Sequence, residues 1–514
     1  MKKILTTATA GFILLASYQA QAQAINEAGA QELKNLLNEQ MQYADEVYAG
    51  VPELQLKHEG ETIVTPQGSY YSVTLPHYSL TIADPSNPTD MMNLDIGKVA
   101  MNVTPQGDDA WSMSIAMPMP MKGTNGDGET IFNINIGQQK AHALFIPSLQ
   151  TSPKYHLSYQ DIVVSDIPGV DMDVRLGELT TSMKLEKTAK NFWSGPASFI
   201  AKNLTVGMKE DGKNFDLRIG DIKMDAAYRE FDLAGASKFY KELGTMDPTA
   251  LTEEATEKLM NDVFTQLFES MDGMDTSFSL NNLNVSWDEG SDDKGTFDLG
   301  TAGFGFTSNG LRGDNGNITF NGHLNQLAIP DVPAEIAGFI PNNIEYKASI
   351  MNLPVKTLFG LGKAMMETSM QGGNPESGIM DAVQIMSQSG TKFILEKHNM
   401  DTPDVGVKAN GEMKVDYSAA MKVIAQFKLS IRNMDELLAK YSTQMQSLPP
   451  QIQGAVMPMM MLQQLGTLTE DATTGQSVRT FEYQLTENGQ MFLNGQDLSA
   501  MLGGAMQQQQ PPRR

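Results

Sequence analysis

Apolar and polar residues alternate along much of this chain, which is the pattern of β-strands with one apolar and one polar face. Residues 71–75 (Tyr-Ser-Val-Thr-Leu), 111–115 (Trp-Ser-Met-Ser-Ile) and 155–159 (Tyr-His-Leu-Ser-Tyr) show it clearly. Clusters of Gly, Asn and Asp, as in residues 124–128 and 291–295, separate such segments. These clusters favour tight reversals of the chain. The pattern predicts a mainly β protein built as an antiparallel β-meander.

A short phrase recurs about every 40 residues. Residues 92–97 (Met-Asn-Leu-Asp-Ile-Gly) reappear in related form at 132–137, 172–177 and 215–220, and in a shorter copy at 297–300. A period of this length indicates repeated supersecondary units. A glycine inside a strand suggests a bulge or bend. The final glycine of each copy therefore predicts an elongated, curved sheet: Gly97, Gly137, Gly177, Gly220 and Gly300.

The spacing of leucines and other apolar residues predicts several helices. Residues 27–48 form an amphipathic pattern with Leu33, Leu36 and Leu37 on one face. A helical insertion is expected over 235–272, and its helix at 251–271 occupies the place of one repeat between Gly220 and Gly300. The domain organisation is then an N-terminal helix at 25–50, a repeated β region at 51–310 and a C-terminal β region at 311–506. The C-terminal region carries helices near 355–387 and 434–465.

The first 24 residues have the features of a cleaved export signal. Lys2 and Lys3 precede a short apolar run, and small residues follow at Ala20, Ala22 and Ala24. No other stretch approaches the roughly 20 apolar residues of a transmembrane helix. The chain has no cysteine, which excludes disulfides and a lipoprotein signal. We expect a periplasmic or extracellular protein with no transmembrane segment after signal cleavage.

The net charge of the chain makes some classes of binding partner unexpected. The formal net charge is −24 at pH 7, whereas nucleic-acid binding needs clustered Lys and Arg. The same charge disfavours docking on an anionic lipid surface. Nucleic acid is therefore not an expected partner. The glutamine- and proline-rich tail at 507–514 is expected to be disordered.

Catalytic and metal-binding motifs are absent from the sequence. The six histidines lack a His-x-x-x-His spacing, and no Gly-x-Ser-x-Gly or phosphate-binding glycine loop occurs. Residues 125–129 carry oxygen donors but not the spacing of a calcium loop, and a hairpin turn explains them better. The methionine clusters lack the His or Cys expected at a copper site. We predict a non-enzymatic protein without metal or cofactor. The alternative is a hydrolase in which His77, His142 and His156 converge with carboxylates.

The C-terminal stretch carries a resemblance to a known group of proteins. Leu437-Leu438, the Met-rich segment around Pro458 and the hairpin at 481–496, with its Glu487-Asn488-Gly489 turn, resemble an uncharacterised family of secreted alphaproteobacterial proteins. That family has no assigned activity, so the resemblance implies export but no functional residues. The long repeated strands are more distantly similar to AsmA-type envelope proteins, whose β-sheet encloses an apolar lipid groove.

These patterns lead to a functional hypothesis. We expect a non-enzymatic envelope protein that holds lipid or another apolar ligand against the apolar side of a concave sheet. Methionine is a flexible, adaptable apolar lining. The alternative is an interaction scaffold that binds another envelope protein through a sheet edge or the N-terminal helix. The predicted groove-lining residues are Met113, Ile115, Met117, Met119, Ile96, Ile136, Leu176 and Ile219.

Overall fold

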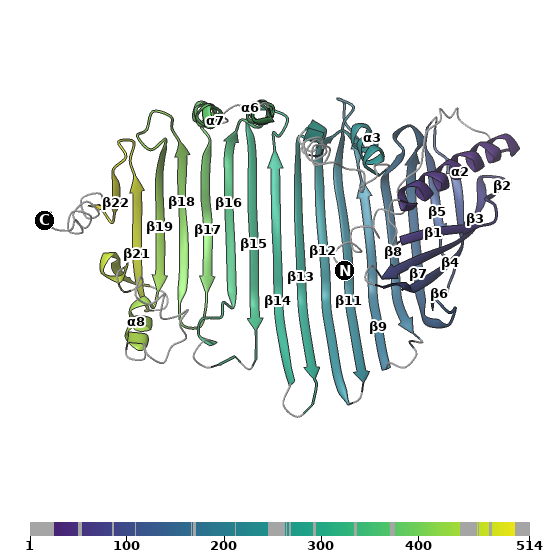
Figure 1. Cartoon of the computed structure of the whole chain (residues 1–514), viewed down its shortest axis with the longest axis horizontal. Helices are drawn as coiled ribbons and strands as arrows, with labels where there is room; N and C mark the ends of the chain where they lie inside the picture. The colour runs from purple at the N-terminus through teal and green to yellow at the C-terminus, as the bar shows by residue number, and fades with distance from the viewer. Residues whose placement is uncertain are drawn as a thin grey trace. The chain divides into compact units, whose positions relative to one another are not determined.

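A computed structural model provides the structure of the chain (Figure 1). It describes residues 25–49, 54–84, 87–107, 109–165, 167, 171–210, 212–244, 263, 265–266, 269–290, 294–330, 332–333, 337–370, 376–442, 460, 462–471 and 475–498. The predicted signal and the predicted disordered tail lie outside these residues. Most of the predicted helices at 251–271 and 451–465 do so too.

The described chain is mostly β, and its 23 strands belong to one antiparallel sheet in meander order. The predicted fold class is therefore confirmed. The chain divides into two compact units. Unit 1 comprises residues 1–271 and 280–296, and unit 2 comprises 272–279 and 297–514. The two units are described separately below.

Unit 1 is a run of antiparallel strands preceded by one helix. Helix α2 spans Glu27–Ala49, close to the predicted bounds. Each long strand pairs mainly with its neighbours in the chain. The remaining elements are β1 (Leu54–Glu59), β2 (Ile63–Gln67), β3 (Tyr70–Asp84), β4 (Asn87–Pro105), β5 (Trp111–Ala116), β6 (Met121–Asn125), β7 (Thr130–Ile146), β8 (Thr151–Ser165), β9 (Asp171–Lys184), β10 (Glu186–Lys187), β11 (Trp193–Glu210), β12 (Lys213–Phe231) and α3 (Leu233–Gly244).

Helix α2 completes the largest hydrophobic core of unit 1. Its Leu33, Leu36 and Leu37 pack against the apolar residues of β3, β4, β5 and β7, among them Trp111 and Phe145. Leu33 is fully buried, with 0% exposure. Burying a leucine side chain contributes about 1.5–3 kcal/mol. The helix is therefore part of the folded core, and its apolar face is not available to a partner protein.

Unit 2 continues the meander with longer connecting helices. Helix α6 spans Val355–Met370, as predicted, and α8 covers Met434–Ser442. Strand β19 (Val423–Arg432) was not predicted. The remaining elements are β13 (Gly273–Asp288) and β14 (Lys294–Asn309), which both cross the boundary between the units, and β15 (Gly316–Ala328), β16 (Asn343–Leu353), α7 (Glu376–Ser389), β17 (Lys392–Asp401), β18 (Gly406–Val415), β20 (Thr467–Glu470), β21 (Ser477–Leu485), β22 (Met491–Leu493) and β23 (Gln496–Asp497).

Gly97 has a φ of 80° and lies at a register shift between β3 and β4, as expected for a bend. The other four repeat glycines have a structural role that differs from the predicted one. Gly137, Gly177, Gly220 and Gly300 are not themselves the sharply bent residues. The residue with left-handed backbone lies on the neighbouring strand, with φ of 53–57° in each case. The four pairs are Gly137 with Asp161, Gly177 with Asn203, Gly220 with Asn282 and Gly300 with Gln326.

The four pairs form a row across the sheet, the glycine row, and this row corrects the expectation that one repeat is missing. Strands with a repeat glycine alternate with strands that carry a left-handed residue, and β13 supplies Asn282 for Gly220 of β12. The 80-residue gap between Gly220 and Gly300 thus contains the usual single intervening strand. Helix α3 and the residues that follow it in the sequence lengthen this gap and replace no repeat.

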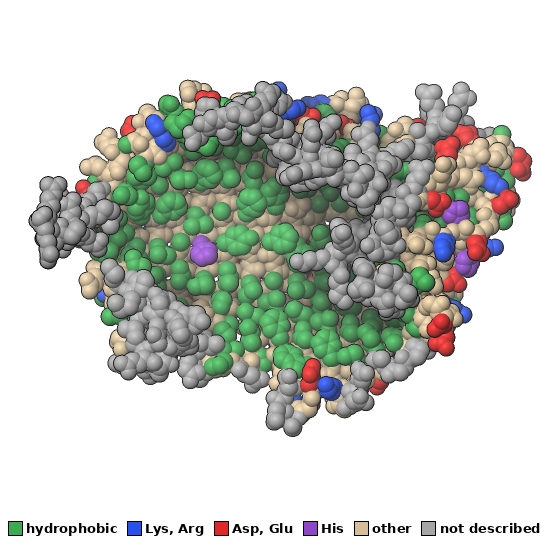
Figure 2. Space-filling view, in the orientation of Figure 1, with side chains coloured by type: hydrophobic (Ala, Val, Ile, Leu, Met, Phe, Trp, Pro, Cys, Tyr) green, Lys and Arg blue, Asp and Glu red, His purple; other side chains and the backbone are tan. Residues whose placement is uncertain are grey.

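The alternation of apolar and polar residues changes phase at this row. In β12 the apolar residues are Leu217 and Ile219 before Gly220, but Ile222 and Met224 after it. The flanking pairs, Leu204 with Ile219 and Lys202 with Asp221, stay in register. Hydrophobic side chains consequently continue over one face of the sheet on both sides of the row (Figure 2).

Candidate functional site

Several of the predicted ligand-binding residues lie side by side on the apolar face of unit 1. Register pairs connect Ile136 to Ile162, Ile162 to Leu176, Leu176 to Leu204 and Leu204 to Ile219. Three of the predicted residues, Ile136, Leu176 and Ile219, therefore lie in one row across five strands. Four strand spacings of about 4.8 Å make this row roughly 19 Å long. All five side chains are half-buried.

The rows on either side of this one are apolar too. Val164, Val174, Val206 and Leu217 form the next row. Tyr159 lies on the same face beyond the glycine row, and burial raises the pKa of its phenol. Met208 and Met224 remain 36% and 51% exposed. This part of the sheet is an open, carbon-rich surface.

The other predicted groove residues do not join this row. Met113 is only 3% exposed and packs in the core beneath α2, so its assignment to a ligand surface is corrected. Ile96 and Ile115 pack against the same core. Met117 lies between β5 and β6, where its backbone N–H and C=O bond the Gln139 side-chain amide at 2.9 and 2.8 Å. Met119 is half-buried in the same connection.

Unit 2 carries a second apolar area that was not predicted from the sequence. One row runs from Phe304 through Gly322, Tyr346, His398 and Ala409 to Leu429. Figure 2 shows hydrophobic side chains gathered over β15–β19. Phe304, Phe320 and Tyr346 are 55%, 45% and 40% exposed. Exposed apolar side chains that gather in one area mark binding surfaces.

Aromatic rings in this area lie against the backbone of glycines. The Tyr346 ring occupies the place where Gly322 of β15 would carry a Cβ, and Phe427 does the same at Gly411 of β18. Phe306 and Phe320 pack with ring centroids 5.2 Å apart, and Phe278 stacks on Phe304 at 5.5 Å. The area therefore combines glycines with aromatic rings from the neighbouring strands.

The opposite face of unit 2 is polar and paired. Lys347 and Lys397 form ion pairs with Glu396 and Glu345, both at 2.5 Å. The hydrogen bond from Lys397 is the main cause that lowers the pKa of Glu345, and those from Lys347 and Ser349 lower that of Glu396. All four side chains are partly exposed to solvent. The two faces therefore differ sharply in chemistry.

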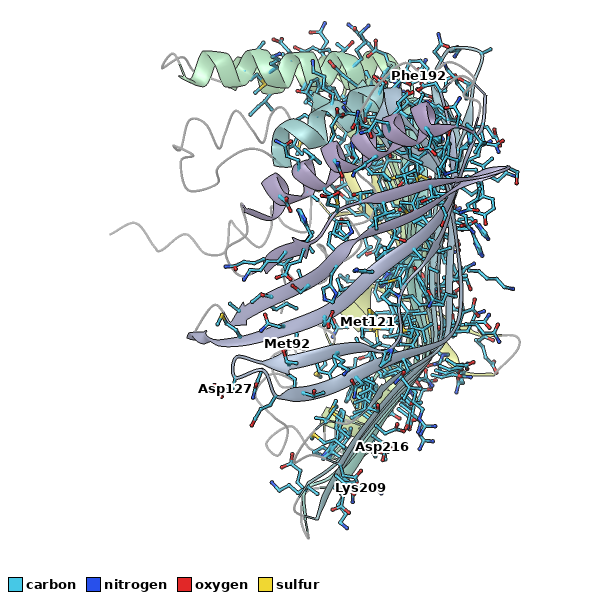
Figure 3. All side chains as sticks on the ribbon, turned by 90° about the vertical axis from the view of Figure 1, so that its right-hand side faces the viewer. Met92, Met121, Asp127, Phe192, Lys209 and Asp216 are labelled. Atoms are coloured by element: carbon cyan, nitrogen blue, oxygen red, sulfur yellow. The ribbon has the colours of Figure 1, made fainter. Side chains whose placement is uncertain are left out.

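The polar face of unit 1 has the same character. Lys202 donates a hydrogen bond of 2.8 Å to Glu178, which lowers the pKa of that carboxyl group. In Figure 3, polar side chains stand along these strands, with Lys209 and Asp216 near the ends of β11 and β12 and Asp127 at the tip of the β6–β7 hairpin. That tip is a capped turn, in which Asn125 Oδ1 accepts hydrogen bonds from the Asp127 and Glu129 backbone N–H groups.

The three histidines considered for a hydrolase do not share one set of contacts. His142 and His156 are register partners, and Ser114 Oγ lies 2.8 Å from His142 Nδ1. His77 instead pairs with Asp95 at 2.7 Å. Among the described residues, no group of three or more His, Asp or Glu is arranged to hold a metal ion.

A separate hollow of about 450 Å³ lies beside α2. Its lining mixes polar and apolar groups, so it is less suited to an apolar ligand than the open faces: Ala28, Gln31, Glu32, Asn35, Leu36, Glu39, Trp111 and Pro147. In the part of the chain that the structure describes, no helix has the length and apolar character needed to cross a membrane.

Comparison with known proteins identifies no relative of this chain. No protein-family model, no curated protein and no solved structure matches it.

The sequence contained a signal for the unit 2 surface. Phe304 and Phe306, and likewise Ile318 and Phe320, alternate with polar or small residues. The repeat phrase becomes short at 297–300 and does not recur later in the chain, so the phase of the later strands could not be aligned with that of the earlier ones. The register of β14–β19 supplied that alignment.

Proposed function

We propose that this protein is a non-enzymatic carrier that holds the acyl chain of a lipid on the apolar face of its sheet. The observation that carries the proposal is the cluster of solvent-exposed Phe304, Phe320 and Tyr346 on the face opposite the ion pairs. The predicted export signal supports an envelope location, where lipids are abundant.

The energetics favour a ligand on this face. Covering apolar surface stabilises a complex by roughly 25 cal/mol per Å². Three large side chains that are about half exposed therefore offer several kcal/mol, before the cost of immobilising the ligand. The ion-paired face offers no comparable gain, because its charged groups would have to lose water.

The chemistry of the face favours an acyl chain over a peptide. A peptide carries backbone N–H and C=O groups that must keep hydrogen-bond partners when buried. The exposed Phe304 and Phe320 side chains have no hydrogen-bonding group, so they cannot supply those partners. An acyl chain has no such requirement and can lie against these rings.

Native mass spectrometry of the mature protein, purified from the periplasm without detergent, tests the proposal. We expect a stoichiometric adduct that organic extraction identifies as an acyl-chain lipid. A clean apo mass together with a co-purifying polypeptide would instead support the interaction-scaffold alternative.

Matched variants connect the adduct to the face. Phe320→Asp places a charge on the apolar face, and Asn410→Asp places the same charge on the exposed polar side of β18. We expect the lipid adduct to disappear in Phe320→Asp and to persist in Asn410→Asp. Equal occupancy in the two variants would show that the ligand lies elsewhere.

A further inference from the structure

His398 is an unusual residue on the apolar face of unit 2. It lies on β17 in register with Tyr346 on one side and Ala409 on the other. The positions that share its face on β15–β19 carry no Asp or Glu. The two charged neighbours in its own strand, Glu396 and Lys397, are ion-paired to Lys347 and Glu345 on the opposite face. The imidazole is therefore a polar group inside a carbon-rich area.

The space beside His398 is open to a ligand. Ala409 presents only a methyl group. The Tyr346 ring packs over Gly322 on β15, which lies on the far side of β16 from His398. Tyr346 thus leans away from the imidazole. His398 itself is half-buried.

The other five histidines have different surroundings. His58, His77 and His142 contact Asp45, Asp95 and Ser114 at 3.0, 2.7 and 2.8 Å. His156 and His323 are exposed on polar rows. Within the described chain the His398 ring likewise makes no hydrogen bond, but it lies on the apolar face. A hydrogen-bonding group in apolar surroundings is favourable when a ligand supplies its partner.

We infer that His398 binds the carboxylate of a long-chain fatty acid whose alkyl chain lies along the apolar face. This inference rests on the proposed acyl-chain function and names its ligand class. An imidazole N–H donates a hydrogen bond to a carboxylate oxygen, and the bond strengthens when the ring is charged. Because no Asp or Glu shares the surrounding face, the carboxylate meets no close like charge there. The alkyl chain then extends toward Tyr346 and Phe304, or toward Leu429.

The test compares two ligands that differ only in the headgroup. Binding of dodecanoate and dodecanol to the full mature chain is measured by titration calorimetry, below the concentration at which either ligand aggregates. The variant is His398→Phe, which keeps a ring but removes the hydrogen-bond donor, and the matched control is His323→Phe on the opposite face of the sheet. We expect His398→Phe to weaken dodecanoate binding roughly tenfold, the effect of one hydrogen bond to a charged group, and not to weaken dodecanol binding. His323→Phe should weaken neither.

The outcomes separate the two proposals. If dodecanoate and dodecanol bind equally well and His398→Phe alters neither or both alike, His398 does not recognise the headgroup, whereas the acyl-chain function stands. If neither ligand binds the unaltered protein, both the carrier function and the role of His398 are wrong. Circular dichroism of each variant confirms that the fold is unchanged.

Discussion

Gly220 on β12 directly faces Asn282 on β13, and a Cβ at Gly220 would lie 3.0 Å from the Asn282 Cβ. Asn282 has a φ of 53°, in the left-handed region that Asn tolerates better than most residues. The left-handed residue turns its side chain toward the neighbouring strand, where only glycine leaves room. At Gly220, as at Gly137, Gly177 and Gly300, the repeated glycine is therefore explained by its neighbour's backbone.

This relationship predicts that Gly220→Ala destabilises unit 1. The new Cβ would also lie 3.2 Å from the Asn281 carbonyl oxygen, so the strands must shift. We expect a loss of about 1–2 kcal/mol in the free energy of unfolding, as for moderate overpacking. Urea denaturation followed by tryptophan fluorescence measures it, because Trp111, Trp193 and Trp287 all lie in unit 1.

Gly207→Ala on β11 is the matched control for that variant. Its added Cβ would make only an ordinary contact with Asp216, at 3.7 Å. Glycine in a strand costs backbone entropy relative to alanine, so Gly207→Ala should be neutral or slightly stabilising. Equal destabilisation by both substitutions would contradict the role assigned to the glycine row.

The residues with left-handed backbone that face the repeat glycines lead to a second prediction about stability. Asn203 has a φ of 55° and an exposed side chain, so its substitution changes mainly the backbone energy. Asn203→Val should destabilise unit 1 by about 1–2 kcal/mol, since a β-branched residue is strained in this region. Asn203→Gly should stay within about 0.5 kcal/mol of the unaltered protein. Tryptophan fluorescence in urea reports both values, and a stable Val variant would argue against a left-handed conformation at this position.

Helix α2 should behave as part of the core. Leu33→Ala removes a fully buried side chain and should cost about 3 kcal/mol. Met224→Ala, at a position that is half exposed on the apolar face, should change the unfolding free energy by less than about 0.5 kcal/mol. If Leu33→Ala were tolerated as well as Met224→Ala, α2 would be free to detach and bind a partner.

The Asp435–Arg479 ion pair predicts a pH dependence in unit 2. Arg479 Nε and Nη2 both bond the Asp435 carboxylate, at 3.0 Å. Burial acts to raise the pKa of Asp435, but the hydrogen bonds from Arg479 and Gln463 outweigh it and lower the pKa overall. The folded pKa then lies below the unfolded value of about 3.9, so the pair stabilises the fold at neutral pH and is lost as pH falls through the folded pKa.

Asp435→Asn should therefore lower the unfolding free energy by about 2 kcal/mol at pH 7. The difference from the unaltered protein should narrow as the pH falls below about 4. Far-ultraviolet circular dichroism in urea measures this at several pH values. Glu482→Gln removes the exposed Lys428–Glu482 pair and serves as the control, with an expected effect below about 0.5 kcal/mol. A pH-independent difference for Asp435→Asn would contradict the proposed linkage.

The sequence by itself determined the class of fold and most of its elements. Alternation of apolar and polar residues requires a sheet with two unlike faces, and this local signal predicted the meander. The apolar period of residues 27–48 predicted α2, and helices were predicted near 355–387, where α6 and α7 lie. These features depend on residues close together in the chain, so a local pattern is sufficient to reveal them.

Only the tertiary structure decided which apolar residues belong to the core. Met113 and Ile136 have the same kind of pattern in the sequence, but Met113 is buried in the core with α2, while Ile136 lies in a half-buried row outside it. The reason is that α2 is far from β5 in sequence and only packing brings them together. Likewise, the repeat glycines were visible in the sequence, but their purpose depended on Asp161, Asn203, Asn282 and Gln326 of the adjacent strands. Strand register, which no local pattern fixes, placed His398 among apolar residues.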